Sequence, residues 1–357
     1  MSKNSLKFPL YTLLLFFLLW NGCNRNNEHL INPLWVLETT YPILFLQDIN
    51  GESIGASAIN RFNIINKREL KIAREIPIVG SSISGMWLED HRLYYGSADH
   101  FFRCYDIDQQ KLIWEYPTLM PNEALPAIDD RCMYGGSRDH SIYTIDKFRG
   151  DLKWKFQTKS SVYARPVLLD SLVLVGSWDT HLYALLRETG KKVWEFTARA
   201  GIDQTPIIFE RTLWLPNYDY HIYGIDLQNG QIKYNLAAEN AFEFSGGRWQ
   251  NMLIFSGIDR HFYFINPQTG QFFINGKSPV AVSASPLVSN NCLFTGHYDG
   301  SLYCWELPAM TNTLLHRFDD RVLSILSDGQ YLWATSWDRT MVCFHIPAEG
   351  FKALPPE

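Results

Sequence analysis

The sequence predicts an all-β fold, an eight-bladed β-propeller made of four-stranded blades. Residues of several kinds recur about every 40 positions, which is typical of a propeller with several strands in each repeat. Aspartates mark the repeat at Asp99, Asp139, Asp179, Asp219, Asp259, Asp299 and Asp338. Tyrosines follow four residues later at Tyr143, Tyr183, Tyr223, Tyr263 and Tyr303, and tryptophans fifteen residues later at Trp114, Trp154 and Trp194. A weaker copy around Ile59 precedes these seven and brings the predicted number of blades to eight.

The elements of one repeat are clearest between residues 172 and 196. The apolar runs 172–176, 181–186 and 192–196 predict three short strands, separated by turns at 177–180 and 188–190. An aspartate in a tight turn accepts hydrogen bonds from the amides that follow it, so the repeated aspartates are predicted to stabilise turns. The fourth, innermost strand is expected near a proline that recurs in most copies, as at Pro166 and Pro206.

The two ends of the chain predict how the ring closes. After Asp338 the sequence has one more strand, to Ile346, and then a Pro-rich tail, so the last blade lacks its outer strand. The segment 33–39 contains Leu-Trp-Val-Leu-Glu, which is similar to the outer strand 192–196. We expect it to complete the last blade, because closing a ring of sheets removes open edges. The first blade would then run from Tyr41 through an Asn50-Gly51 turn to about Ile72.

The first residues predict targeting to the cell envelope. Two lysines precede an apolar run at 8–20, which is typical of a signal peptide and short for a membrane-spanning helix. Gly22-Cys23 resembles the end of a bacterial lipobox, although Trp20 and Asn21 depart from its usual residues. This predicts a signal peptide at 1–22, a lipidated Cys23 with a tether to residue 32, and a propeller at 33–357; an uncleaved signal-anchor is the alternative. By the same resemblance, Asn24 favours outer-membrane anchoring, facing the periplasm.

Charge and cysteine content narrow the class of protein. The net charge of −5 implies no basic face, so we expect no nucleic-acid partner. Five cysteines remain after Cys23, and the chain has no CxxC motif, so no zinc site is expected. Cys104, Cys304 and Cys343 share one column of the repeat, where a small buried side chain fits. A disulfide between Cys292 and Cys304, which belong to one hairpin, is left open.

The repeat G-S-x-D-x-x-[LI]-Y, followed by T-G and a tryptophan, resembles the PQQ-like propeller repeat. The best copies are 176–194 and 136–154, and the resemblance covers about residues 33–350. In this family the tryptophan docks against the neighbouring blade, which implies structural roles for Trp114, Trp154 and Trp194. One branch, the quinoprotein dehydrogenases, holds PQQ and Ca²⁺ with the help of large insertions and an adjacent pair of cysteines, which this chain lacks. The other comprises compact BamB-type outer-membrane lipoprotein propellers, which are non-catalytic scaffolds.

The columns of the repeat contain the candidate site residues. The turn aspartates lie in equivalent turns of successive blades, so they are predicted to be structural and not to converge on one ion. His181, His221 and His261 each follow an aspartate by two residues, and the same repetition favours a structural role over metal binding. The column just before the aspartate varies and is expected at exposed turn tips; it contains Arg138, Trp178, Tyr218, Tyr298 and Trp337.

Exposed aromatic and arginine side chains on one rim favour a partner-binding surface. The alternative is that each side chain packs over the neighbouring blade. Connecting segments on the same rim carry Tyr163, Arg165, Asp203, Glu243 and Arg248, which are expected near the mouth of the funnel. Neither a catalytic triad nor a phosphate-binding loop is recognisable in the sequence.

The sequence therefore predicts a non-catalytic, lipid-anchored, monomeric propeller without a cofactor. It would act as a scaffold for envelope proteins, with outer-membrane protein assembly as the specific role implied by the resemblance. The alternatives are a PQQ-dependent dehydrogenase and a propeller that binds a small ligand or glycan in its funnel.

Overall fold

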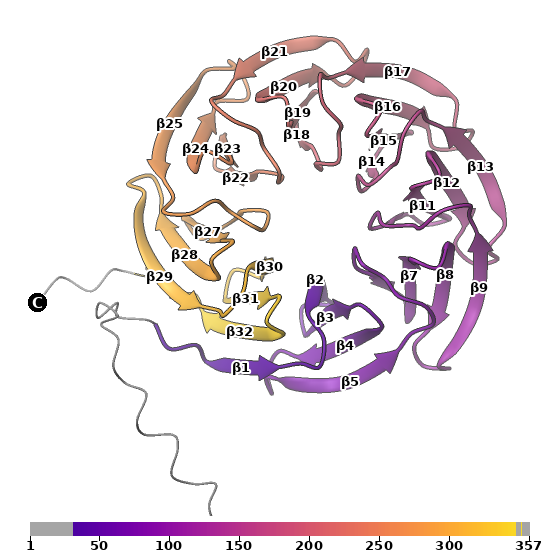
Figure 1. Cartoon of the computed structure of the whole chain (residues 1–357), viewed down its shortest axis with the longest axis horizontal. Coiled ribbons are helices and arrows are strands. Elements are labelled where there is room, and N and C mark those ends of the chain that lie inside the picture. Colours follow the sequence, from indigo (N-terminus) through magenta and orange to yellow (C-terminus); the bar gives the residue numbers. More distant parts are fainter. Residues whose placement is uncertain (1–30, 348–350, 352–357) are drawn as a thin grey trace, which may run out of the picture.

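The computed structural model describes residues 31–347 and residue 351 as a ring of eight four-stranded antiparallel sheets (Figure 1). The predicted eight-bladed propeller is confirmed. The regular secondary structure of the described residues consists of β-strands. These residues contain no helix that is long and apolar enough to cross a membrane. Cys23 and the preceding signal segment lie outside the described residues.

Seven blades consist of four consecutive strands each, ordered from the ring axis outward. Blades 1 to 4 contain β2 (Ile43–Ile49), β3 (Ser53–Ala58), β4 (Arg61–Asn66), β5 (Lys71–Pro77); β6 (Trp87–Glu89), β7 (Arg92–Gly96), β8 (Phe101–Asp106), β9 (Lys111–Pro117); β10 (Ala127–Ile128), β11 (Cys132–Ser137), β12 (Ser141–Asp146), β13 (Leu152–Gln157); β14 (Val167–Leu169), β15 (Leu172–Gly176), β16 (His181–Leu186), β17 (Lys192–Thr197). Blades 5 to 7 contain β18 (Ile207–Phe209), β19 (Thr212–Pro216), β20 (His221–Asp226), β21 (Ile232–Ala237); β22 (Gly247–Trp249), β23 (Met252–Ser256), β24 (His261–Ile265), β25 (Phe272–Lys277); β26 (Leu287–Ser289), β27 (Cys292–Gly296), β28 (Ser301–Glu306), β29 (Thr311–Arg317).

Blade 8 joins the two ends of the chain, as predicted. It contains β30 (Val322–Ser327), β31 (Tyr331–Ser336), β32 (Thr340–His345) and, as its outer strand, β1 (Trp35–Glu38). β1 is antiparallel to β32, with Trp35 opposite Cys343 and Glu38 opposite Thr340. The Thr335 hydroxyl also donates a 2.9 Å hydrogen bond to the Ile43 carbonyl of blade 1. The first and last blades of the ring are therefore connected through both β1 and this hydrogen bond.

The end of blade 1 corrects the sequence-based boundary. The sequence placed it at about Ile72, but β5 begins at Lys71 and continues to Pro77. Ile76 is 2% exposed and lies opposite Phe62 of β4, which is fully buried. Burial of this apolar pair extends the strand beyond Ile72. The predicted turn at Asn50-Gly51 is present, with both residues at positive φ, 54° and 68°.

The hydrophobic core lies between the blades. One cluster combines Leu182 and Trp194 of blade 4 with Leu213 and Ile225 of blade 5, and comparable clusters join other neighbouring blades. A four-stranded blade cannot bury both of its faces alone, so each blade is stabilised by the next. Burial of apolar area between blades thus makes the ring one cooperative unit.

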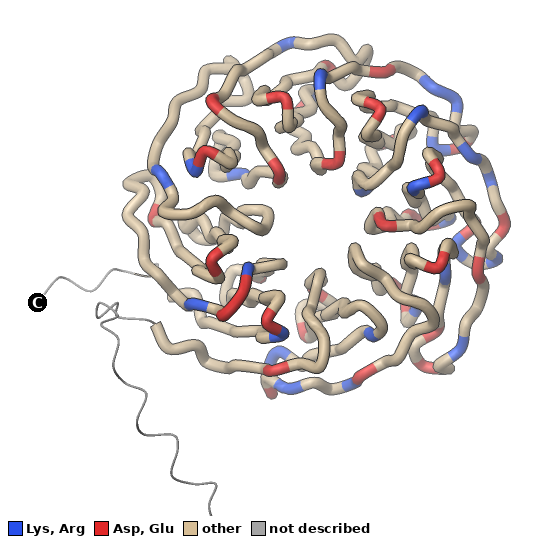
Figure 2. The backbone as a smooth tube through the Cα atoms, viewed as in Figure 1, with Lys and Arg blue, Asp and Glu red and all other residues tan. Residues whose placement is uncertain are grey.

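Charged residues of both signs are distributed around the ring (Figure 2).

The five cysteines among the described residues are free thiols, so the disulfide left open between Cys292 and Cys304 is not formed. Cys104, Cys304 and Cys343 are fully buried in the small-residue column.

Candidate interaction surface

The turns that carry the repeated aspartates and the connections between blades lie on one edge of the ring, which we call the turn rim. Asp179 shows how they are tied together. Its Oδ2 accepts hydrogen bonds from the Tyr183 hydroxyl and from the Lys159 amide of the preceding connection, both at 2.8 Å. Its Oδ1 accepts the amide of His181 at 3.1 Å. Each such aspartate can therefore link its turn to the chain arriving from the previous blade.

The other turn aspartates use variants of this pattern. Asp139 and Asp219 bind the tyrosine four residues on and an amide of the preceding connection. Asp259 binds Tyr263, and Asp338 accepts the Asp319 amide at 2.8 Å. Asp99 and Asp299 instead bind arginines, Arg103 and Arg317. In each of these turns at least one carboxylate oxygen is therefore engaged within the scaffold.

The tryptophan column connects neighbouring blades. The indole nitrogens of Trp114, Trp154 and Trp194 donate hydrogen bonds of 2.9, 2.7 and 3.0 Å to the carbonyls of Lys147, Arg187 and Leu227 in the next blade. All three side chains are 7–8% exposed. Each ring also lies against a glycine of the next blade, Gly150, Gly190 or Gly230, with no room for a Cβ atom. The contact buries a large apolar ring while satisfying its N–H group.

The variable column on the turn rim is more exposed. Trp178 is 51% exposed, and Tyr298 and Trp337 are each 41% exposed. Arg138 and Tyr218 are partly buried. Half-exposed aromatic side chains at turn tips offer apolar area to a partner without being part of the core.

Trp178 is held in place although half of it faces solvent. Its Nε1 donates a 3.2 Å hydrogen bond to Asp203 Oδ2, and its ring makes a T-shaped contact with the Tyr163 ring at a centroid distance of 5.4 Å. It also lies over Gly201, where a Cβ atom would be 3.1 Å from Cγ of the indole. Both readings of this column therefore apply to Trp178, because it packs over adjacent connections and remains exposed.

Two carboxylates accept hydrogen bonds from three of the rim aromatics. Asp203 also accepts a 3.4 Å hydrogen bond from the Tyr218 hydroxyl, and Glu243 accepts the Tyr298 hydroxyl with both oxygens at 2.9 Å. Burial raises the pKa of Asp203, and the charge of Glu243 raises it further. Burial and the Glu243 hydrogen bond raise the pKa of Tyr298 to about 12. We call Trp178, Tyr218, Tyr298, Asp203 and Glu243 the rim cluster; it spans the connections and turns of blades 4 to 7.

The remaining two residues of the column have other partners. Arg138 Nη1 lies 3.3 Å from Glu123 Oε1, and the Arg321 guanidinium lies 5.1 Å from the centre of the Trp337 ring. The structure thus brings Trp178, Tyr218 and Tyr298 into one cluster, while Arg138 and Trp337 lie on other parts of the rim.

Some exposed residues of the rim were missed by sequence analysis. Ile258 occupies the same column and is 39% exposed, so the repeat spacing itself could have found it. Leu119, 76% exposed, lies in a connection, and Tyr220, 51% exposed, follows a turn aspartate. No repeat-wide pattern of residue type marks these two positions.

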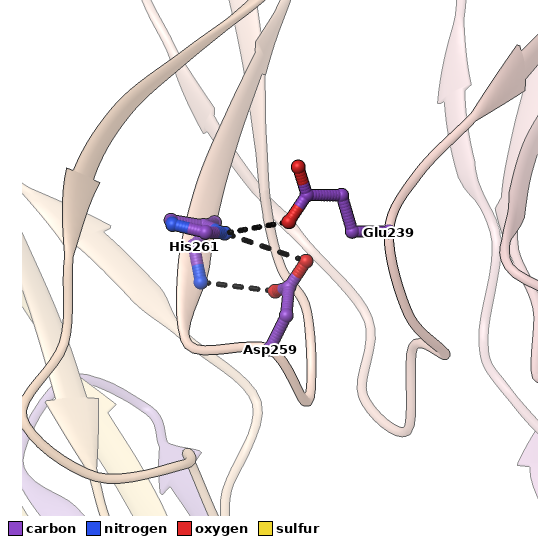
Figure 3. Close-up of side chains that lie close together, drawn as sticks. All are labelled: Glu239, Asp259 and His261. Atoms are coloured by element: carbon purple, nitrogen blue, oxygen red, sulfur yellow. Dashed lines mark hydrogen bonds and ion pairs between the residues drawn. The ribbon is translucent and has the colours of Figure 1, made fainter.

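One histidine of the repeat lies in a group with two carboxylates, shown in Figure 3. Ligand atoms of Glu239, Asp259 and His261 all lie within 4.8 Å of one another. His261 Nδ1 is 3.5 Å from Asp259 Oδ2 and 3.9 Å from Glu239 Oε2. In blades 4 and 5 the equivalent nitrogens of His181 and His221 lie 2.8 Å from the carbonyl of the turn aspartate.

The additional group in blade 6 is Glu239, whose side chain is 71% exposed. Asp259 already accepts the Tyr263 hydroxyl and the His261 amide. The arrangement thus keeps the aspartate contacts of the repeat and adds one solvent-facing carboxylate, while His261 Nδ1 lacks the carbonyl contact seen in blades 4 and 5. We assign it a structural role.

Comparison with known proteins shows which family has this architecture. A family model described as "Outer membrane protein assembly factor BamB" matches residues 159–347, just over half of the chain. The chain belongs to this family. The resemblance to BamB-type, PQQ-like propellers seen in the repeat is therefore confirmed. No curated protein sequence gives a significant match.

Solved structures show the same fold as this BamB-family chain. BamB from Moraxella catarrhalis superposes with a TM-score of 0.75 at 17% identity, over 89% of this chain and 100% of that one. The computationally designed protein Ika8 superposes with a TM-score of 0.76 at 16% identity, over 87% of this chain and 98% of that one. At these identities the likeness concerns the fold.

Proposed function

We propose that this chain is a non-catalytic, lipid-anchored extracytoplasmic propeller that acts as a protein-interaction scaffold in outer-membrane protein assembly. Membership of the BamB family supports the assembly role. The lipobox-like Gly22-Cys23 supports anchoring through a lipid on Cys23, with the ring in the periplasm. Its partners on this proposal are envelope proteins, which the monomeric propeller binds through the turn rim.

The observation that carries the proposal is the orientation of exposed aromatics on the rim. Trp178 and Tyr298 are 51% and 41% exposed, yet each donates a hydrogen bond to a carboxylate in a connection between blades. Side chains that are already ordered lose little conformational entropy when a partner binds. Trp, Tyr and Arg are also the residue types that dominate interface energetics.

The charge of the rim cluster indicates which partner surface fits it. Asp203 and Glu243 lie beside the exposed rings, and Asp203 is only partly accessible. A partner segment that combines an apolar side chain with a basic one would complement this surface, because opposite charges steer association and set specificity.

The proposal is tested by affinity purification from cross-linked envelopes. We expect the Trp178→Ala/Trp337→Ala double variant to recover its partner at least tenfold less than the wild type. Phe273→Ala is the matched control, since Phe273 is also 51% exposed but lies on the outer strand β25. Equal recovery by the double variant and the control would contradict the proposal.

The non-catalytic part of the proposal has its own test. Purified protein incubated with PQQ and Ca²⁺ should not reduce a dye in the presence of alcohols or sugars. Dye reduction that depends on added PQQ would favour a quinoprotein dehydrogenase instead.

A further inference from the structure

Arg165 lies beside the ring axis, where its side chain reaches across a whole blade. It precedes β14 of blade 4, and its guanidinium carbon lies 4.6 Å from the centre of the Trp87 ring in blade 2. Trp87 is itself 6.5 Å from the ring of Phe45 in blade 1. Arg165 therefore spans blade 3 to reach its aromatic partner.

Blade 3 leaves room for this arrangement. Its inner strand β10 is two residues long, and Ala127 occupies the position equivalent to Trp87 in blade 2 and Val167 in blade 4. A larger side chain at 127 would fill the space between Arg165 and Trp87. A cavity of about 280 Å³ remains there, lined by Trp87, Ala127, Ile128, Arg165, Val167 and Thr205 among others.

The guanidinium in this cavity has no anionic partner among the described residues. The guanidinium stacks on Trp87, and burial lowers the pKa of Arg165. Two arginines elsewhere in the ring do pair with carboxylates: the buried Arg103 binds Asp99 and Glu115, and the partly buried Arg187 binds Asp129. Arg165 is partly buried, and a cation that is partly removed from water gains from pairing, so an anion that enters the cavity finds a charged partner there.

The lining determines which anion fits. A guanidinium presents two parallel N–H groups that match a carboxylate, and the walls at Ile128 and Val167 are apolar. The cavity is near the lower end of the sizes typical of small-molecule sites. We propose that this cavity binds a small organic monocarboxylate, with its carboxylate on Arg165 and its apolar body against Ile128 and Val167. A tricarboxylate such as PQQ would leave charge unpaired beside a single arginine.

The test is calorimetric titration of the full-length protein in detergent with benzoate. We expect the wild type to bind one benzoate per chain. Benzoate should bind Arg165→Gln at least tenfold more weakly than the wild type, and benzamide should bind the wild type at least tenfold more weakly than benzoate does. Arg165→Lys keeps the charge without the paired N–H groups and should bind with intermediate affinity. Arg248→Gln is the matched control, because Arg248 also stacks on an aromatic ring, Phe209 at 4.8 Å, but is exposed; it should bind like the wild type.

Several outcomes would overturn the inference. They are no benzoate binding to the wild type, equal binding by Arg165→Gln, or an equal loss in Arg248→Gln. A carboxylate can belong to a small molecule or to a polypeptide C-terminus, and titration with the peptide Gly-Gly-Gly-Phe separates these two sources. If the protein binds the peptide but does not bind benzoate, the site is assigned to a polypeptide C-terminus, which contradicts the small-molecule proposal. Circular dichroism melts show whether Arg165→Gln and Arg165→Lys are folded. The titration does not involve the aromatic side chains tested for partner binding, so its failure leaves the scaffold proposal standing.

Discussion

The indole nitrogen of Trp154 donates a 2.7 Å hydrogen bond to the carbonyl oxygen of Arg187, a residue of the next blade. Together with burial of the ring to 8% exposure, this bond joins blades 3 and 4. Trp154→Ala should lower the free energy of unfolding by about 3–5 kcal/mol, as expected for a large buried aromatic. Trp154→Phe should cost less, because it keeps most of the apolar contact.

Urea unfolding followed by circular dichroism measures both variants. Trp178→Ala serves as the control, because Trp178 is half exposed, and it should cost about 1 kcal/mol or less. Equal losses for Trp154→Ala and Trp178→Ala would contradict the docking role of Trp154.

Gly190 faces the same indole from the neighbouring blade. Its φ is +70°, and a Cβ atom would lie 2.5 Å from the Trp154 ring. Gly51 has nearly the same φ, +68°, but nothing within 4 Å of its Cβ position. We expect Gly51→Ala to cost about 1 kcal/mol from backbone strain alone, and Gly190→Ala to cost clearly more because the ring must move. Comparable urea midpoints for the two variants would show that Gly190 is required only for its backbone conformation.

The closing strand β1 has one face toward the core and one toward solvent. Leu37 packs against the cluster between blades 8 and 1, whereas Val36 is 50% exposed. Leu37→Asp should destabilise the ring by about 3 kcal/mol, since it places a charge in an apolar contact, while Val36→Asp should stay within about 0.5 kcal/mol. Thermal unfolding compares the pair. A loss for Val36→Asp as large as that for Leu37→Asp would argue against this orientation of β1.

Sequence periodicity predicted the parts of the molecule that depend on local spacing. The turns, the number of blades and the closing strand follow from columns such as those of Asp179 and Trp194, because the same short-range contacts recur in every repeat. Contacts between non-equivalent positions could not be predicted in this way. Arg165 stacks on Trp87 beside the small Ala127 of blade 3, and Trp178 is oriented by Asp203 of the next connection. Such contacts depend on which residues differ between blades.

Ionisation of Asp203 in the rim cluster should make the free energy of unfolding depend on pH. Burial raises its pKa above the ordinary value of 3.8, despite the hydrogen bonds from Trp178 and Tyr218. A carboxyl group with a raised folded pKa favours the folded state at low pH, and this contribution is lost as pH rises through the folded pKa. Asp203→Asn should therefore gain stability relative to the wild type as pH rises from below 4 toward neutrality.

Asp129→Asn provides a control of opposite sign for this pH experiment. Although burial opposes it, pairing with Arg187 lowers the pKa of Asp129. Its stabilising contribution is present above the unfolded pKa and lost as pH falls, so Asp129→Asn should be less stable than the wild type at neutral pH and approach it in acid. Urea unfolding at several pH values measures both differences. A pH-independent difference for Asp203→Asn would show that its carboxylate is ionised in the rim without cost.

The central claim, that the turn rim is the partner-binding surface, is tested most directly by site-specific photo-crosslinking in intact cells. A photoreactive residue is placed in turn at 178, 298 and 337 on the rim, and at 273 on the outer strand. We predict cross-links to the same envelope protein from the rim positions and none to it from position 273. Cross-links to that protein from position 273 alone, with none from the rim, would contradict this account.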